Sequence, residues 1–339
     1  MNESKAMILG CSGLALTGEE REFYRAERPW GFILFKRNVE EPDQIRALVA
    51  DLRACVGRED APIFIDQEGG RVQRLRPPLA PSYPPGAAIG AIYAASKTKG
   101  RRAAWLMSRL HAFDLLGYGI NADCLPVLDV PVDGAHDVIG NRAYSKDPKT
   151  VSILGKAAAK GLTDGGVLPV IKHVPGHGRA FSDSHLALPV VDTPLAQLRA
   201  HDFVPFKANS RAGMAMTAHV IYTAIDPERP ATTSSKVISG YIRGEIGFGG
   251  LLMSDDLSMK ALSGDFADRA AASLAAGCDV VLHCNGLMEE MRPVASAVGA
   301  LKGEAARRAK RAMRPLGRKD GANEAQLREE FAALTGAVA

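Results

Sequence analysis

The chain has 339 residues, of which 46% are hydrophobic and 24% are charged, a composition typical of a globular protein. A formal net charge of +4 is small and evenly spread, which argues against a nucleic-acid partner and favours a neutral or mixed one. The length allows one large α/β barrel or two ordinary domains, and no uninterrupted apolar stretch reaches the roughly 20 residues that a bilayer crossing needs.

The cysteines give no sign of a disulfide framework. They are odd in number, scattered and without a C-x-x-C pair, so a zinc knuckle is not supported either. The five positions are Cys11, Cys55, Cys124, Cys278 and Cys284. We expect a reducing, cytoplasmic setting.

The first candidate element is the run MILGC at residues 7–11, which superficially resembles the end of a lipoprotein signal. The run is short, and Glu3 stands where such a signal carries basic residues. Thr17 and Glu20 have the spacing of a capping box, which predicts that a helix begins directly afterwards. We therefore interpret the segment as part of the folded domain.

Short apolar runs alternate with helical patterns along the rest of the chain. The predicted strands are residues 31–35, 62–66, 120–127, 167–171, 213–217, 250–254 and 279–282. Helices are predicted over 42–56 and 103–116, and after the Asp-Pro and Thr-Pro pairs at 147–148 and 193–194. An eighth strand is not evident. From about residue 287 the chain is helical and basic, which is typical of a solvated helix face.

Repeated strand–helix units without a Gly-rich phosphate motif predict an α/β fold closed as a TIM-type (β/α)₈ barrel, in preference to a doubly wound open sheet. Polar residues at the C-terminal ends of the predicted strands support the barrel, because barrel enzymes build their sites on that face. These residues are Asp66, Asp123, Lys172, His173, His219, Asp255 and Asp256. We expect a single barrel domain over residues 1–339, with a helical C-terminal segment from about 287.

The densest group of chemically active side chains is KHVPGHGRAFSDSH at residues 172–185. Asp183 beside His185 could form a general acid/base pair, because a carboxylate bonded to an imidazole raises its pKa and fixes its tautomer. A metal site built from His173, His177, Asp183 and His185 is the alternative, although no standard ligand spacing supports it.

Two adjacent carboxylates, Asp255 and Asp256, follow the sixth predicted strand. Successive side chains of a strand diverge, so we expect only one of them in the barrel mouth and the other in a capping or structural role, with capping of a helix that begins at Met259 as the first expectation. Capping alone and catalysis combined with capping fit the sequence equally well.

Asp66 and Arg142 each have two interpretations. Asp66 precedes a Gly-Gly pair; in a barrel mouth it could accept hydrogen bonds from two neighbouring sugar hydroxyls, or it could belong to a tight turn with solvated charges. Arg142 lies in a loop, where a surface ion pair of little energetic value is the alternative to a binding role.

Taken together, these motifs resemble the bacterial β-N-acetylhexosaminidases of glycoside hydrolase family 3, the single-domain enzymes of peptidoglycan recycling. The resemblance rests on GFILFKRN at 31–38, IDQEGGRVQR at 65–74, NADCLPVLDV at 121–130, KHVPGHG at 172–178 with DSH at 183–185, and SDDLSM at 254–259. The last two motifs set the chain apart from the β-glucosidases of the family, which the resemblance implies use a glutamate from a further domain.

The resemblance implies a role for eight residues and a barrel without cofactor or metal. Asp255 is similar to the nucleophile, and Asp183 with His185 to the general acid/base dyad. Residues similar to those that bind the N-acetylglucosamine ring are Asp66, Arg74, Arg142, Lys172 and His173. The loop of Arg142 is only loosely similar to the family pattern.

The implied reaction is that of a retaining exo-β-N-acetylglucosaminidase, with a covalent glycosyl-Asp255 intermediate. Its substrates would be muropeptides such as GlcNAc-1,6-anhydroMurNAc, with or without peptide, or chitooligosaccharide-like small saccharides. We expect a cytoplasmic monomer without nucleic-acid partners or membrane insertion. Gly176 and Gly178 are expected to act as joints of a mobile loop that delivers His185 and reopens for release.

Three other readings remain open at this point. A phosphorylase is one, because a neutral or cationic histidine repels an incoming phosphate dianion less than a carboxylate would. An inactive sugar-binding barrel is another, although the intact Asp183, His185 and Asp255 argue against it. A metallohydrolase would lose its activity with chelators, whereas the glycosidase should not.

Overall fold

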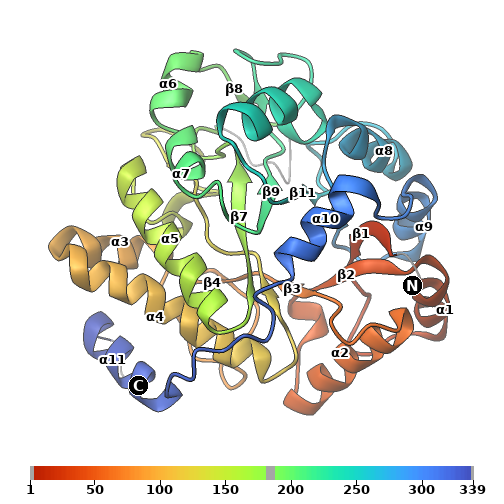
Figure 1. Ribbon diagram of the computed structural model, residues 1–339, viewed down its shortest axis with the longest axis horizontal. Coiled ribbons are helices and arrows are strands. Elements are labelled where there is room, and N and C mark those ends of the chain that lie inside the picture. The colour runs from red at the N-terminus through yellow and green to blue at the C-terminus, as the bar shows by residue number, and fades with distance from the viewer. Residues whose placement is uncertain (1–3, 181–187, 337–339) are drawn as a thin grey trace.

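The computed structural model describes residues 4–180 and 188–336. Eight parallel strands form a closed barrel in the order β1-β12-β11-β9-β7-β6-β3-β2, with helices around it (Figure 1). The predicted (β/α)₈ fold is therefore confirmed. The barrel strands are β1 (Lys5–Leu9), β2 (Pro29–Leu34), β3 (Ile63–Ile65), β6 (Ala122–Asp123), β7 (Leu168–Val174), β9 (Met214–Thr217), β11 (Leu251–Asp256) and β12 (Val280–His283).

Helices follow every barrel strand. They are α1 (Gly18–Glu27), α2 (Pro42–Val56), α3 (Gly86–Ala95), α4 (Lys97–Leu116), α5 (Pro148–Asp164), α6 (Leu195–Ala200), α7 (Phe203–Ala208), the π-helix η4 (Lys236–Glu245), α8 (Phe266–Ala276), α9 (Met288–Ala297), α10 (Gly303–Ala312) and α11 (Glu324–Thr335). Short 3₁₀ turns are η1 (Lys36–Asn38), η2 (Gly140–Arg142) and η3 (Ala231–Thr233). Two small strand pairs lie outside the barrel: β4 (Gln67–Gly69) with β5 (Val72–Gln73), and β8 (Val190–Val191) with β10 (Ile221–Tyr222).

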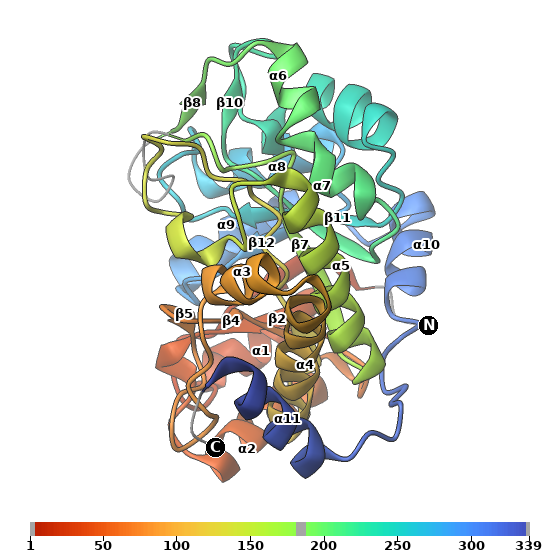
Figure 2. The same ribbon diagram turned by 90° about the vertical axis from the view of Figure 1, so that its left-hand side faces the viewer.

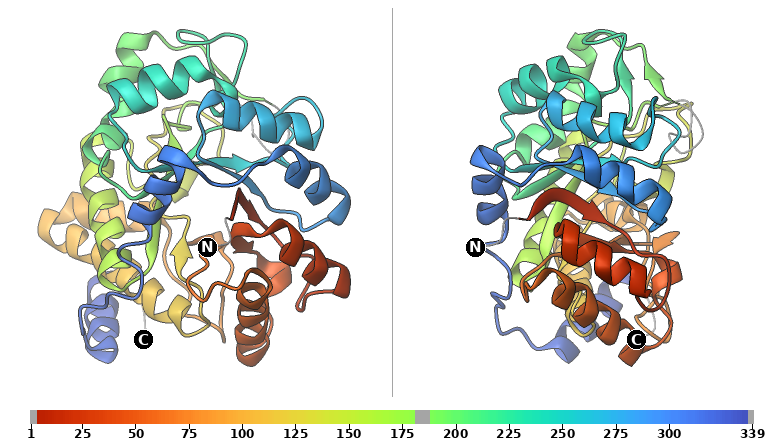
Figure 3. Two further views of the ribbon diagram at one scale, coloured as in Figure 1. Left: turned by 45° about the vertical axis from the view of Figure 1, so that its right-hand side comes forward. Right: turned by 90° about the vertical axis from the view of Figure 1, so that its right-hand side faces the viewer.

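The strand that the sequence pattern did not reveal is β1. It pairs in parallel with β2 on one side and with β12 on the other, and so closes the barrel. Figure 3 shows this red N-terminal strand beside the blue C-terminal part of the chain. Residues 7–9 thus lie in β1, and the run 7–11 is part of the folded domain, as expected. The predicted capping box is also confirmed, because Thr17 Oγ1 accepts from Glu20 N and Glu20 Oε2 accepts from Thr17 N.

The barrel strands are continuous apolar runs in the sequence because both of their faces are buried. A parallel strand covered by helices on one side and by the barrel interior on the other has no solvent face. All six residues of β2 and all seven of β7 are buried. The helices instead bury one stripe, as α2 does with Ile45, Leu48, Val49, Leu52, Cys55 and Val56.

The strand β6 is much shorter than predicted. Beyond Asp123 the chain still bonds to β7, because Val170 N donates to Leu125 O, Lys172 N donates to Pro126 O and Leu128 N donates to Lys172 O. The predicted strand over 120–127 is thus a two-residue strand followed by isolated contacts with β7.

The C-terminal helices pack on the barrel through charged side chains as well as apolar ones. Figure 2 shows α11 against α4. Arg102 of α4 forms a bidentate pair with Glu330, and the buried Arg109 pairs with Asp320 at 2.8 Å. Arg308 reaches the buried Asp279 at 2.9 Å, so the basic segment is only partly the solvated face that was expected. In the described part of the chain, no helix has both the length and the apolar character to cross a membrane.

Candidate active site

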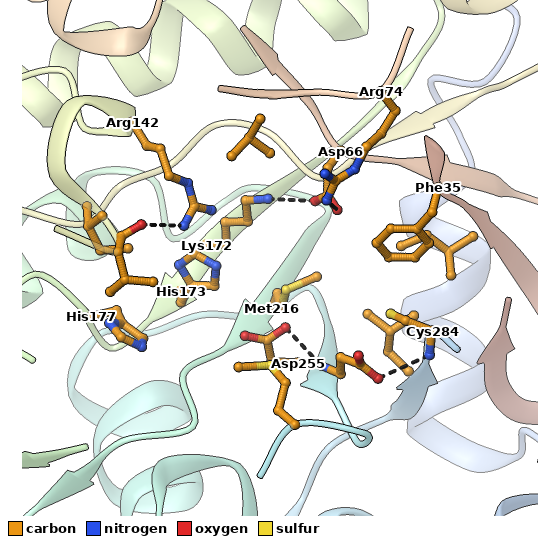
Figure 4. A pocket seen from close by; sticks show the side chains of 17 residues that line it. Phe35, Asp66, Arg74, Arg142, Lys172, His173, His177, Met216, Asp255 and Cys284 are labelled. Carbon is orange, nitrogen blue, oxygen red and sulfur yellow. Dashed lines mark hydrogen bonds and ion pairs between the residues drawn. The ribbon is translucent and has the colours of Figure 1, made fainter. Parts of the chain in front are cut away.

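A pocket lies at the C-terminal ends of the barrel strands (Figure 4). The fold brings six of the residues predicted from the sequence into its lining: Asp66, Arg74, Arg142, Lys172, His173 and Asp255. They come from the end of β3, the end of β5, the turn η2, and the strands β7 and β11. Phe35, His177, Met216, Asp256 and Cys284 also line the pocket. Asp183 and His185, the predicted acid/base dyad, lie outside the described residues.

Asp66 is held between two cations. Its Oδ1 accepts from Lys172 Nζ at 2.9 Å and its Oδ2 accepts from Arg74 Nη2 at 3.0 Å. Burial raises the pKa of the Asp66 carboxyl, but the charges of Lys172 and Arg74 outweigh burial and hold the pKa well below its usual range. Asp66 is therefore ionised, and each carboxylate oxygen has a further lone pair for a ligand hydroxyl.

Glu68 is a site residue that the sequence analysis missed. Its two oxygens accept from Arg142 Nε and Nη2 at 2.8 Å each, and its Oε1 lies 2.6 Å from Lys172 Nζ. Burial raises the pKa of Glu68, but Arg142 and Lys172 outweigh it and lower the pKa to about 2. The sequence did offer a signal for Glu68: side chains of an extended chain alternate between two faces, so residues 66 and 68 are expected on the same side. Arg142 is thus in a buried bidentate pair, not in a surface ion pair.

Asp129 is a second residue that was missed, and it holds the start of the histidine segment. Its Oδ2 lies 2.7 Å from His173 Nδ1, and its Oδ1 accepts from His173 N at 3.2 Å and from His177 N at 2.6 Å. Burial raises the pKa of Asp129, but His173 outweighs it and lowers the pKa to about 2. The carboxylate therefore fixes the orientation of the His173 ring.

Asp255 lies at the end of β11, with its carboxylate toward the pocket (Figure 4). Its Oδ1 accepts from Asp256 N at 2.8 Å, and its own N–H donates to Thr217 Oγ1 at 3.3 Å. Burial raises the pKa of Asp255, but the nearby His219 and His173 outweigh it and lower the pKa. The pocket lining thus contains an ionised carboxylate at the end of β11.

Comparison with known proteins agrees with this geometry. The glycosyl hydrolase family 3 N-terminal domain matches residues 8–315. The chain belongs to glycosyl hydrolase family 3. A β-hexosaminidase of Alkalilimnicola ehrlichii is 41% identical over 283 residues, which are 82% of this chain and 80% of that protein. A β-hexosaminidase of Stenotrophomonas maltophilia strain K279a is 39% identical over 287 residues, 82% of this chain and 83% of that protein.

Solved structures give the same result. NagZ from Neisseria gonorrhoeae, in complex with N-trifluoroacetyl-D-glucosamine, superposes with a TM-score of 0.88 at 32% identity and covers 99% of both chains. The resemblance expected from the motifs is confirmed. This family 3 protein is a glycoside hydrolase of the β-N-acetylhexosaminidase type.

Two predictions about the carboxylate pair of this family 3 hydrolase are wrong. Asp255 and Asp256 both line the pocket. Asp256 caps no helix: it accepts from Ser258 N, Ser258 Oγ and Cys284 N, while the next helix, α8, begins at Phe266 and is capped by Asp265. A register shift between Met253 and Asp256 accompanies this end of β11 and explains how neighbouring residues reach one pocket.

Two other residues at strand ends lie next to the site without lining the pocket. Asp123 is fully buried and accepts from Gln67 N at 3.0 Å, and burial raises the pKa of its carboxyl. His219 bridges Thr232 Oγ1 at 2.7 Å and the carbonyl oxygen of Asp256 at 2.9 Å, and burial lowers the pKa of its ring. Both lie outside the pocket lining.

The glycines of the histidine segment serve packing in the described structure. A Cβ on Gly178 would lie 2.1 Å from the carbonyl oxygen of Val130, and the Gly176 carbonyl accepts from Tyr222 OH at 2.7 Å. His136 N donates to the Ala180 carbonyl at 2.8 Å. Residues 176–180 thus contact neighbouring segments, and Gly178 in particular has no room for a side chain. The role of Gly176 and Gly178 as joints of a mobile loop stays a prediction.

The metal alternative gains no support from the part of the chain that is described. Among residues 4–180 and 188–336, no three His, Cys, Asp or Glu side chains are grouped so that they could hold a metal ion. The proposed ligands Asp183 and His185 lie outside that part.

Proposed function

We propose that this family 3 hydrolase is a retaining exo-β-N-acetylglucosaminidase that releases terminal N-acetylglucosamine from peptidoglycan fragments, with Asp255 as the nucleophile. The observation that carries the proposal is the position of Asp255: an ionised carboxylate that faces the cluster of Asp66, Lys172 and Arg74 across one pocket. A sugar held by that cluster has its ring inside the pocket that Asp255 lines.

The cluster suits a neutral, hydroxyl-rich ring. Asp66 can accept from two neighbouring hydroxyls, while Lys172, Arg74 and Arg142 offer charged donors with fixed orientations. His173, held by Asp129, adds a ring nitrogen whose orientation is set. NagZ from Neisseria gonorrhoeae forms a complex with N-trifluoroacetyl-D-glucosamine, which supports an N-acylated glucosamine as the ligand of this site.

The proposed reaction has two displacements. Asp255 attacks the anomeric carbon while His185, paired with Asp183, protonates the leaving oxygen; water then attacks the glycosyl-Asp255 ester and the configuration is retained. A histidine acid departs from the two-carboxylate arrangement of most retaining enzymes. The preferred substrate in this proposal is GlcNAc-1,6-anhydroMurNAc, with or without a peptide.

The ion pairs of the pocket's lysine and arginine side chains favour hydrolysis over phosphorolysis. Each lysine and arginine among the described pocket residues is paired with a carboxylate: Arg74 and Lys172 with Asp66, and Lys172 and Arg142 with Glu68. A phosphate dianion would have to compete with these carboxylates. We further infer a cytoplasmic monomer; the five cysteines are free and buried, which fits a reducing compartment.

Covalent trapping tests the proposal. The enzyme is incubated with a fluorinated N-acetylglucosamine analogue, digested, and searched for a labelled peptide by mass spectrometry, with Asp255→Asn as the matched control. We expect the label on Asp255 and no label in the control. A label on Asp256, or none with active enzyme, would overturn the assignment.

Substrate and acceptor are tested by product analysis. We expect the enzyme to release N-acetylglucosamine from GlcNAc-1,6-anhydroMurNAc, and to form the free sugar in phosphate buffer. Formation of N-acetylglucosamine 1-phosphate would show a phosphorylase instead.

A further inference from the structure

Glu68 belongs to a chain of alternating charges beside the pocket. It binds Arg142 through both oxygens and Lys172 through Oε1, and Lys172 in turn binds Asp66, which binds Arg74. The order in space is therefore cation, carboxylate, cation, carboxylate, cation. Five residues from three parts of the chain, 66–74, η2 and β7, act as one electrostatic unit.

Glu68 itself stands behind the pocket wall. Its side chain is 3% exposed, and its four companions in the chain of charges line the pocket, whereas Glu68 reaches the pocket through Arg142 and Lys172. Figure 4 shows Arg142, Lys172 and Asp66 along the pocket that Asp255 enters from the other side. A change at Glu68 therefore acts on ligands through its two cationic partners.

The charge count explains why a carboxylate is needed there. Three cations in this unit face two carboxylates, and loss of Glu68 would leave Arg142 without its charged partner and Lys172 with Asp66 alone. An arginine and a lysine that converge without a carboxylate between them form a binding site for oxyanions, because a guanidinium fork and an ammonium both match phosphate.

We propose that Glu68 is the positioning residue of the sugar site: it holds Arg142 and Lys172 in the geometry that binds a neutral sugar, and it keeps oxyanions such as inorganic phosphate out of the pocket. The inference rests on the proposed function, because Arg142 and Lys172 are taken to bind the sugar ring.

Glu68 lies in β4, which forms a hairpin with β5, and a second contact of this hairpin offers a matched control. Arg71, in the turn between β4 and β5, pairs with Asp137 Oδ2 at 3.0 Å and donates to the Val138 carbonyl at 2.8 Å, so it ties the hairpin to the loop that carries Arg142. This contact is exposed. Arg71→Ala therefore loosens the loop without altering the buried charges.

The experiment compares Glu68→Gln, Glu68→Asp and Arg71→Ala with the natural enzyme. Steady-state kinetics on an aryl β-N-acetylglucosaminide in phosphate-free buffer give kcat and KM, and titration calorimetry gives the affinity for inorganic phosphate. For Glu68→Gln we expect KM to rise about tenfold or more with a smaller change in kcat, and phosphate to bind at least about tenfold more tightly and inhibit competitively.

The other two variants separate charge from geometry. Glu68→Asp keeps the charge but is one methylene shorter, so we expect a raised KM and the phosphate affinity of the natural enzyme. Arg71→Ala should also keep that phosphate affinity. If Glu68→Gln shows natural KM and natural phosphate affinity while only its Tm falls, Glu68 is merely structural and the inference is overturned.

Two further outcomes remain decisive. Should Glu68→Gln not fold, an unchanged KM in Glu68→Asp contradicts the positioning role, and a raised KM supports it. Should the natural enzyme not cleave the aryl glycoside, the proposed function fails, but calorimetry with phosphate on the natural protein and Glu68→Gln still tests the exclusion of oxyanions by itself.

Discussion

At the scale of single residues, partners decide what each carboxylate does. Asp255 and Asp256 are adjacent and both line the pocket, yet Asp256 receives three donors, from Ser258 N, Ser258 Oγ and Cys284 N. Asp255 accepts from a backbone N–H beside it and keeps its ionised oxygens toward the pocket. Three hydrogen bonds from protein donors hold Asp256 in the structure, whereas Asp255 keeps a carboxylate oxygen available to a ligand, which fits its proposed role.

The two positions should respond to the same substitution in opposite ways. Asp255→Asn should lower kcat on the order of a thousandfold or more, because it removes the proposed nucleophile, with a small effect on stability. Asp256→Asn should lower the free energy of unfolding by about 1–3 kcal/mol through lost hydrogen bonds, with a far smaller loss of kcat. Kinetics on an aryl glycoside and urea unfolding measure both. A larger loss of kcat in Asp256→Asn than in Asp255→Asn would contradict this assignment of the two carboxylates.

At the scale of elements, β7 and the segment after it determine where the ligand groups stand. The strand carries Lys172 and His173 to the barrel mouth, and Asp129 then ties His173 and His177 to the neighbouring segment. Gly178 lets this segment approach the Val130 backbone closely. The site residues are therefore positioned by packing between two barrel segments.

Because Gly178 lies so close to the Val130 backbone, a single methyl group added at position 178 should destabilise the fold. A Cβ at position 178 would lie 2.1 and 2.3 Å from backbone atoms of Val130, which cannot move aside as a side-chain end can. We expect Gly178→Ala to lower the free energy of unfolding by about 1–3 kcal/mol. Gly249→Ala is the control, because its Cβ would meet nothing within 4 Å. Equal unfolding curves for the two variants would contradict the packing role.

At the scale of the whole molecule, buried ionisable groups link folding to pH. The folded-state pKa of Glu68 and of Asp129 is about 2, below the ordinary values of their carboxyls, so the unfolded chain takes up these protons first on acidification. Their contribution to stability is present above about pH 4.5 and is lost toward pH 2. Burial and the neighbouring His173 lower the pKa of His177 to about 4, so the unfolded chain also takes up a proton there between about pH 6.5 and 4.

Protonation of His177 and protonation of the two carboxyls both lower the stability as the pH falls. We therefore expect Tm to fall in two stages between pH 7 and pH 2, first through His177 and then through Glu68 and Asp129. Scanning calorimetry across this range measures it. Asp129→Asn removes one of the carboxyls and should make the lower stage shallower while the upper stage persists. A Tm that is constant or rises between pH 6.5 and 4 would show that His177 is not a neutral buried group in the folded protein.

The sequence by itself determined the strand–helix alternation, the barrel and most of the pocket. Each is encoded locally: buried parallel strands are continuous apolar runs, helices repeat every 3.6 residues, and the C-terminal end of a barrel strand is where its ligand groups stand. Asp66, Lys172 and Asp255 could be identified in that way before any contact was known, and all three line one pocket.

Only the tertiary structure decided which residues are partners. The pairing of Glu68 with Arg142 and Lys172, and of Asp129 with His173, joins residues distant in sequence, and no local period encodes such a contact. The closing strand β1 was hidden for the same reason, because a short apolar run becomes a strand only when β2 and β12 supply its hydrogen bonds. Local pattern specifies elements, whereas hydrogen bonding and charge pairing depend on distance in space.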